Sequence, residues 1–191
     1  DARVIADEIH APIIYEGLEH TPAATIDDQT VITVTAASKA WNLPGLKCAQ
    51  VVLTNETDRA VWRDFFAPHK VGVGTFGLIA SAAAYSSGGE WFEQVLAILA
   101  SNRDLLTSLL AEHVPEARFS PPEGTYLGWL DMTAYGLDHP NRVLREEARV
   151  ALTAGGPFRG DGAQHVRLNF ATDPEILAEI VERIGASTRS L

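Results

Sequence analysis

The sequence has little cysteine and no long apolar run. Cys48 is the only cysteine among 191 residues, so no disulfide can form within the chain, and a reducing compartment such as the cytoplasm is expected. No apolar stretch approaches the roughly 18 residues that a transmembrane helix needs. The first residues also lack the basic-then-apolar pattern of a signal peptide. We therefore expect a cytoplasmic protein that does not cross a membrane.

Basic residues are also few, and metal-binding patterns are missing. The chain has 15 Lys and Arg against 25 Asp and Glu, a net charge of −10, which argues against nucleic acid or an anionic membrane surface as a partner. Cys48 has no C-x-x-C partner, and no two of the six histidines are four residues apart, so we expect no metal site. The hydrophobic content of 46% is sufficient for a buried core.

The first half of the chain has the pattern of an α/β domain. Three runs rich in β-branched residues, at 3–9, 31–35 and 48–53, predict buried strands that pair in parallel. Helices are predicted over 56–66, capped by Asn55 or Thr54, and then over 76–85 and 90–113.

The second half has shorter elements separated by proline and glycine. The pattern predicts strands at 117–119, 125–131 and 165–170, and helices at 140–154 and 173–184. We therefore predict two domains, over residues 1–100 and 101–191, with the boundary inside the long helix.

Lys39 follows the strand predicted at 31–35 and precedes a turn-forming segment that contains Pro44 and Gly45. A desolvated amine on such a turn can be uncharged and can form a Schiff base with an aldehyde cofactor. A lysine without catalytic work is the alternative. A Ser–Lys hydrolase is excluded, because that pairing needs a serine three residues before the lysine and Ala36 is there.

Asp7 and Arg167 are the other two candidates that follow from the predicted strands. Asp7 ends its strand at the edge where the next strand delivers Lys39, and a carboxylate there can hold a pyridinium proton. A helix cap or a loop carboxylate is the alternative. Arg167 lies within an apolar strand and needs an anionic partner, either a ligand carboxylate or a structural ion pair.

One nucleotide-binding pattern is present outside its usual context. Residues 72–77 read G-x-G-x-x-G, but the preceding segment, 65–70, is not a clean strand. Because the motif is specific only between a strand and a helix, we interpret these residues as a loop before a helix.

Five segments, taken in order, resemble one family. They are Asp7-Glu8-Ile9-His10, the lysine loop 37–47, Glu90-Trp91 with Asn102-Arg103, the strand 122–131, and the strand 165–171. They resemble the fold-type I pyridoxal-phosphate (PLP) enzymes of the aminotransferase class I/II superfamily, and within it the C–S lyase branch of the MalY/PatB type. The resemblance implies a PLP-dependent transferase-like α/β fold. Residues 1–100 would be the second half of a mainly parallel-sheet large domain, and residues 101–191 an α+β small domain.

The resemblance also implies roles for individual residues. Lys39 would be the Schiff-base lysine and proton shuttle, and Asp7 would pair with the pyridine nitrogen. His10 would lie near the 3-oxygen of the ring, Lys47 near the phosphate, and Arg167 would bind the substrate α-carboxylate.

One position departs from the family pattern. Many relatives have a phosphate-binding serine where this chain has Ala36. Ser38 or Thr35 would then contact the phosphate instead.

The expected activity is PLP-dependent β-elimination of cystathionine or cysteine S-conjugates, giving a thiol, pyruvate and ammonia, in a homodimer. The alternatives are an aminotransferase on the same scaffold and a non-catalytic, regulatory protein-binding role. Family chains are about twice this long, so we expect a fragment that lacks the phosphate-binding glycine loop and has an incomplete site.

Overall fold

The computed structural model describes residues 2–65 and 72–189. The chain divides into two compact units, Asp1–Leu96 and Ala97–Leu191, and the division falls inside helix α4 (Gly89–His113). Phe66, where the first helix is predicted to end, and residues 66–70 of the segment before the glycine motif lie outside the described part. No helix in the described part is long and apolar enough to cross a membrane.

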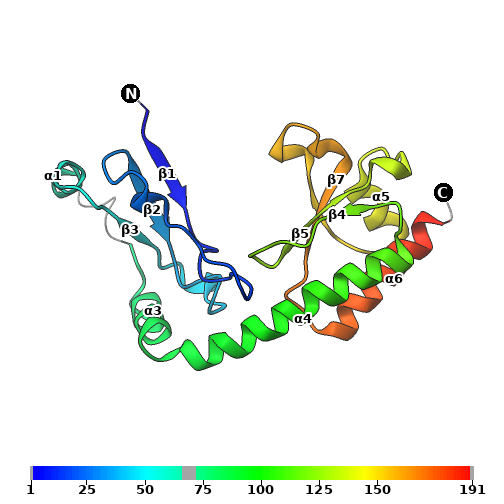
Figure 1. Ribbon diagram of the computed structural model, residues 1–191, viewed down its shortest axis with the longest axis horizontal. Coiled ribbons are helices and arrows are strands. Elements are labelled where there is room, and N and C mark those ends of the chain that lie inside the picture. Colours follow the sequence, from blue (N-terminus) through cyan, green and yellow to red (C-terminus); the bar gives the residue numbers. More distant parts are fainter. Residues whose placement is uncertain (1, 66–71, 190–191) are drawn as a thin grey trace. The chain divides into compact units, whose positions relative to one another are not determined.

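The first unit contains a three-stranded sheet in the order β1-β2-β3 (Figure 1). Strand β1 (Val4–Asp7) is parallel to β2 (Val31–Thr35), whereas β3 (Gln50–Val52) is antiparallel to β2. The predicted parallel pairing is therefore confirmed for the first two strands and wrong for the third. Residues 36–49 contain only a single 3-10 turn, Pro44–Leu46, instead of a crossover helix, so the chain turns back on itself.

Burial in this sheet is concentrated in its central strand. Val31 and Thr33 of β2 are buried, whereas Ile5 of β1 is 71% exposed and Val51 of β3 is 41% exposed. The prediction of three buried strands is thus wrong for the two outer ones, because each pairs along only one edge within the described residues.

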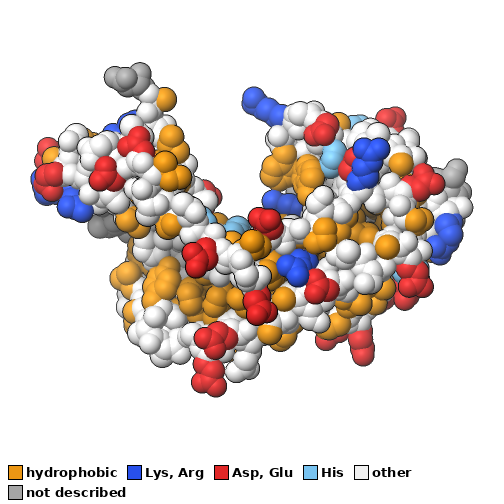
Figure 2. Space-filling view, in the orientation of Figure 1, with side chains coloured by type: hydrophobic (Ala, Val, Ile, Leu, Met, Phe, Trp, Pro, Cys, Tyr) orange, Lys and Arg blue, Asp and Glu red, His pale blue; other side chains and the backbone are white. Residues whose placement is uncertain are grey.

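Two helices of the first unit lie where the sequence predicts them, but the helix predicted over 56–66 ends at Asp64, because Phe65 has an extended backbone. Helix α1 (Glu56–Asp64) begins after Asn55, whose side chain accepts a hydrogen bond from the Asp58 backbone N–H, so Asn55 is the cap. Helix α3 (Thr75–Ser87) is apolar over most of its length, and apolar side chains gather at the surface over it in Figure 2. Its buried residues are small ones: Gly77, Ser81 and Ala84.

The second unit is a four-stranded antiparallel sheet with helices against one face (Figure 1). The order is β4 (Arg118–Phe119), β5 (Leu127–Asp131), β7 (His165–Asn169) and β6 (Thr153–Ala154). The core of this unit includes Leu106, Leu130, Val166, Leu168 and Val181, all at most 1% exposed.

Helix α5 (Pro140–Glu147) ends earlier than predicted. Arg149 has φ +57°, a left-handed conformation that stops the helix, and Thr153 pairs with Arg167 across β6 and β7. The predicted helix over 140–154 is therefore wrong beyond Glu147. The last helix, α6 (Pro174–Thr188), begins after its cap Asp173 and is one turn longer than predicted.

Asn102 ties helix α4 to the segment after β7. Its amide nitrogen donates to the carbonyl oxygens of Phe170, at 2.9 Å, and Thr172, at 2.7 Å. The side chain is almost fully buried. The Asn102-Arg103 motif therefore includes a residue that fixes the path of the chain between β7 and α6.

Candidate active site

Asp7 is the last residue of β1 and Glu8 follows it, and their two carboxylates have different surroundings. Asp7 is exposed, and its side chain accepts one local hydrogen bond, from the Ile9 backbone N–H. The Glu8 carboxylate instead contacts other parts of the first unit. One oxygen accepts a hydrogen bond from the Ala23 N–H at 2.7 Å, and the other lies 3.5 Å from His20 Nε2. Of the two, Asp7 is the carboxylate that a ligand can reach.

The lysine loop begins at the same edge of the sheet. Asp7 pairs with Val34 in parallel register, so β1 and β2 end side by side, and Lys39 comes four residues after β2. A hydrogen bond from the Trp41 N–H to the Ala37 carbonyl, at 3.0 Å, closes a turn around Lys39. Lys39 is half-buried and forms no ion pair with a described residue.

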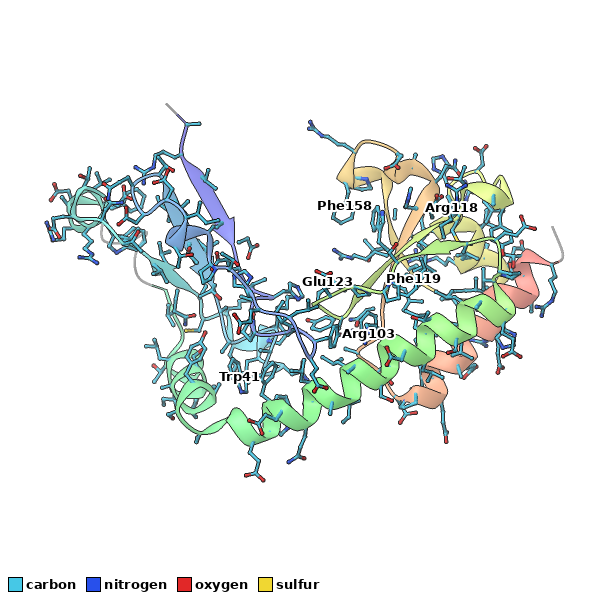
Figure 3. The ribbon with its side chains drawn as sticks, in the orientation of Figure 1. Trp41, Arg103, Arg118, Phe119, Glu123 and Phe158 are labelled. Carbon is cyan, nitrogen blue, oxygen red and sulfur yellow. The ribbon has the colours of Figure 1, made fainter. Side chains whose placement is uncertain are left out.

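Trp41 anchors this loop to the junction of α3 and α4 (Figure 3). Its indole Nε1 donates to the Gly88 carbonyl at 2.9 Å, and its ring contacts Tyr85 and Phe92 at centroid distances of 5.3 and 5.2 Å. Gly88 has to be a glycine, because a Cβ there would lie 2.5 Å from Trp41 Nε1. The tryptophan therefore fixes the loop two residues after Lys39.

Gly77 fixes the far end of the same loop. A Cβ on Gly77 would lie 2.5 Å from the Leu46 carbonyl oxygen and 3.1 Å from Cys48 Cβ. This last glycine of the G-x-G-x-x-G segment thus lets α3 approach the lysine loop. Close packing explains the residue without a nucleotide.

The other predicted cofactor contacts also belong to the first unit. His10 is half-buried, and its carbonyl accepts from the Ile13 N–H at 2.8 Å. Ser38 is half-buried, with its carbonyl bonded to the Leu43 N–H at 2.9 Å. Lys47 is exposed, with φ +50°. Ala36 is 4% exposed, so its side chain contributes only an apolar contact.

Arg167 lies in the second unit, on the middle of β7, opposite Trp129 of β5. Its guanidinium carbon lies 5.2 Å from the centre of the Phe158 ring. Its side chain forms no hydrogen bond or ion pair with a described residue. The structural ion pair that was the alternative for this arginine is thus absent from the described part of the chain.

Three side chains near these elements have shifted pKa values. Burial raises the pKa of Tyr126, which precedes β5, and of Tyr85, where Cys48 adds to the effect. On β5, hydrogen bonds from the Thr133 hydroxyl and backbone N–H lower the pKa of Asp131, so this carboxylate stays charged.

The structure groups the predicted site residues by unit. Asp7 ends β1 and Lys39 follows the parallel strand β2 at the same end of the first sheet, whereas Arg167 belongs to the second unit. Sequence reasoning missed the supporting residues Gly88 and Phe158. The sequence signals for them were weak: Gly88 follows the small-residue helix α3, and Phe158 is an aromatic residue in the segment after β6.

Comparison with known proteins identifies the family. The family model described as aminotransferase class I and II matches residues 1–184. Cystathionine beta-lyase of Corynebacterium glutamicum is 41% identical over 190 residues, which cover 97% of this chain and 50% of that protein. Cystathionine beta-lyase PatB of Bacillus subtilis is 29% identical, over 96% of this chain and 49% of that protein.

Solved structures agree with the sequence relatives. The crystal structure of a candidate PLP-dependent beta-cystathionase from Corynebacterium diphtheriae has a TM-score of 0.94 and 40% identity, covering 99% of this chain and 51% of that one. The predicted fold-type I, α/β architecture is confirmed. The chain spans about half the length of the curated relatives it matches. By its sequence and its fold, the chain belongs to the aminotransferase class I and II family.

Proposed function

We propose that the protein containing these residues is a PLP-dependent carbon–sulfur lyase. It would eliminate the β-substituent of cystathionine or of a cysteine S-conjugate and release a thiol, pyruvate and ammonia. The observation that carries this proposal is the pair Asp7 and Lys39. Asp7 is a reachable carboxylate that ends β1, and Lys39 is an amine without an ion-pair partner in the described part of the chain, which follows the parallel strand β2. The likeness to lyases over almost the whole chain selects the reaction type.

The side chains present fit PLP as a ligand. Asp7 would hold the proton of the pyridine nitrogen, and His10 would lie near the ring oxygen. Lys47 and Ser38 would contact the phosphate, a region in which Ala36 offers no side-chain donor. When bound, PLP supplies an electron sink for the bond broken at the substrate α-carbon.

Lys39 would hold the cofactor and move the substrate proton. With the cofactor bound, the Lys39 amine would remove the proton from the substrate α-carbon as a general base. The bond from Trp41 to Gly88 supports this role, because it fixes the loop close to the amine.

Arg167 would bind the substrate α-carboxylate. A guanidinium matches a carboxylate with two parallel hydrogen bonds. The guanidinium of Arg167 has no carboxylate partner within the described residues, which leaves its donors for a ligand.

The domain assignment is part of the same proposal. Residues 1–100 would form the second half of the PLP-binding large domain, and residues 101–191 the small domain. The whole protein would work as a homodimer in the cytoplasm. A reducing compartment is consistent with Cys48, the one cysteine of these 191 residues, which is buried and unpaired.

An aminotransferase is the second candidate, favoured by the family model itself, which is described as aminotransferase class I and II. The same lysine, aspartate and arginine would serve transamination. The two reactions differ in their products, since a transaminase yields the oxo acid of its substrate without releasing the β-substituent.

The test uses the full-length protein and its Lys39→Ala variant. With L-cystathionine, the parent should release pyruvate and thiol, and should show a visible absorbance band from bound PLP. The variant should lose both pyruvate release and the band. An oxo acid that retains the sulfur substituent would replace the lyase by the transaminase. Unchanged activity in the Lys39→Ala variant would overturn both.

A further inference from the structure

The Arg167 guanidinium contacts the Phe158 ring and no acidic side chain of the described residues. Alternation along β7 and β5 places His165, Arg167 and Trp129 on one face of the second unit's sheet, opposite the face that carries the buried Leu130 and Val166. The distance of 5.2 Å from the guanidinium carbon to the Phe158 ring centre is within the range of a cation–π interaction.

The conformation of the loop between β6 and β7 places the Phe158 ring beside Arg167. The backbones of Gly155 and Gly162 touch at its neck, where a Cβ on either glycine would collide with the carbonyl of the other. The Phe158 N–H donates to the Gly155 carbonyl at 2.9 Å. This neck fixes the position of a side chain that is itself 53% exposed. Figure 3 shows Phe158 on this loop, beside the sheet.

A second aromatic ring, that of Trp129, packs against the Phe158 ring. Trp129 meets Phe158 edge-to-face at a centroid distance of 5.4 Å, and stacks on the His165 ring at 5.2 Å with an interplanar angle of 17°. Edge-to-face and offset-stacked arrangements are the favourable geometries for aromatic pairs. Phe158 is therefore supported by its loop and by the sheet.

We propose that Phe158 is a positioning residue that orients Arg167 for one substrate carboxylate. An acidic partner would occupy the N–H donors of the guanidinium, whereas a ring face attracts the cation and uses none of them. The donors stay available for a bidentate carboxylate. This inference rests on the proposed function, in which Arg167 binds the α-carboxylate.

The inference predicts a change in discrimination and not a general loss of binding. An amino acid and its carboxamide differ in covalent structure only at the group that Arg167 would recognise. Replacing Phe158 with leucine keeps an apolar side chain and removes the ring, so the preference for the carboxylate should fall by roughly tenfold, in keeping with the strength of a cation–π contact.

The experiment measures equilibrium binding of L-alanine and L-alaninamide to the full-length protein by calorimetry. The parent should prefer L-alanine, Phe158→Leu should lose most of that preference through weaker L-alanine binding, and Phe158→Tyr should restore it. Arg159→Lys is the matched control, because it changes the same loop and keeps its charge. The inference is overturned if the parent has no preference, if the ratio is unchanged in Phe158→Leu, or if both ligands weaken equally, as a merely structural role requires.

Pyruvate release, assayed on the same preparations, separates this inference from the proposed function. A ratio that depends on Phe158 in a protein that forms no pyruvate supports the positioning role and rejects the lyase. Pyruvate formation with a ratio that ignores Phe158 supports the lyase and rejects the positioning role.

Discussion

Adjacent carboxylates of the first unit differ in what their oxygens contact. The Glu8 side chain is 12% exposed and accepts a hydrogen bond from the Ala23 N–H, whereas Asp7 is exposed and, among the described residues, accepts only from the local Ile9 N–H. Asp7→Asn should therefore leave the fold intact and lower the rate of pyruvate release by roughly 100-fold or more, the scale of losing a group that stabilises developing charge. Steady-state kinetics on the full-length protein measures this.

The neighbouring position provides the control. Glu8→Ala should lower the free energy of unfolding by about 1 kcal/mol, since it removes a hydrogen bond. The rate of the folded enzyme should change far less than in Asp7→Asn. Equal rate losses in the two variants would show that this strand end acts through the fold and not through the Asp7 carboxylate.

Asn102 contributes to stability through two backbone carbonyls that accept hydrogen bonds from its amide nitrogen. Asn102→Ala should cost roughly 1–3 kcal/mol at the buried Phe170 carbonyl, and less at the part-buried Thr172 carbonyl, because each loses its donor. Asn102→Asp should cost more, because carboxylate oxygens would face the carbonyls of Phe170 and Thr172. Urea unfolding of these variants, with the exposed neighbour Ser101→Ala as control, tests the order Asp, Ala, parent from least to most stable. Asp and Ala variants of equal stability would contradict it.

At the scale of elements, two adjacent glycines differ in what they contact, and only Gly88 lies against the lysine loop. Gly88→Ala would place a methyl group 2.5 Å from Trp41 Nε1, whereas a Cβ on Gly89 meets nothing within 4 Å. Gly88→Ala should therefore destabilise the protein by about 1–3 kcal/mol through overpacking, and should weaken the visible band of bound PLP. Gly89→Ala should do neither. Thermal unfolding and an absorbance scan of the two variants provide the comparison, and matching behaviour would remove the anchoring role of Trp41.

Helix α1 is joined to the start of β1 by an ion pair between Asp58 and Arg3. Hydrogen bonds from Arg3 and from the Asn55 amide lower the pKa of the Asp58 carboxyl below its ordinary value. A lowered folded-state pKa contributes stability above the unfolded-state pKa, and that stability is lost as the pH falls through the folded-state value. Asp58→Asn should therefore be less stable than the parent at neutral pH, and the difference should shrink below about pH 4. Urea titrations at several pH values measure it, and a difference independent of pH would contradict the assignment.

Elements with long periodic patterns were predictable from the sequence. The apolar spacing over residues 90–113 predicts α4 to within one residue. The orientation of β3 was not predictable from its own residues, because it is decided by the connection that precedes it. The end of α5 was missed because Arg149 adopts a left-handed conformation, and an arginine in a sequence does not indicate a positive φ.

The same distinction applies to the site. The strand and turn patterns locate Lys39 and Asp7 at one sheet edge, since parallel strands end together. The contacts of Trp41 with Gly88, and of Phe158 with Arg167, join segments whose proximity depends on the tertiary fold. The roles assigned to these residues remain predictions that the experiments above address.

At the scale of the whole molecule, each unit has its own buried centre, and α3 carries one of the exposed apolar surfaces of the first unit. Phe76, Leu78 and Ile79 are 78%, 56% and 60% exposed, although the helix is apolar over most of its length. A helix that is apolar on all sides is normally buried, and a contiguous exposed apolar patch usually marks an interaction surface. The surface over α3 is thus the place where these 191 residues, taken by themselves, should associate.

The polypeptide of residues 1–191 should therefore form concentration-dependent oligomers, and the double variant Phe76→Gln with Ile79→Gln should shift it toward the monomer. Ile176→Gln is the matched control, because this side chain is 51% exposed on α6 beside the acidic Glu175. Sedimentation velocity over a range of concentrations measures the distribution. If the parent is monomeric throughout, or if Ile176→Gln dissociates it as well as the double variant does, then α3 is not the surface through which the chain associates.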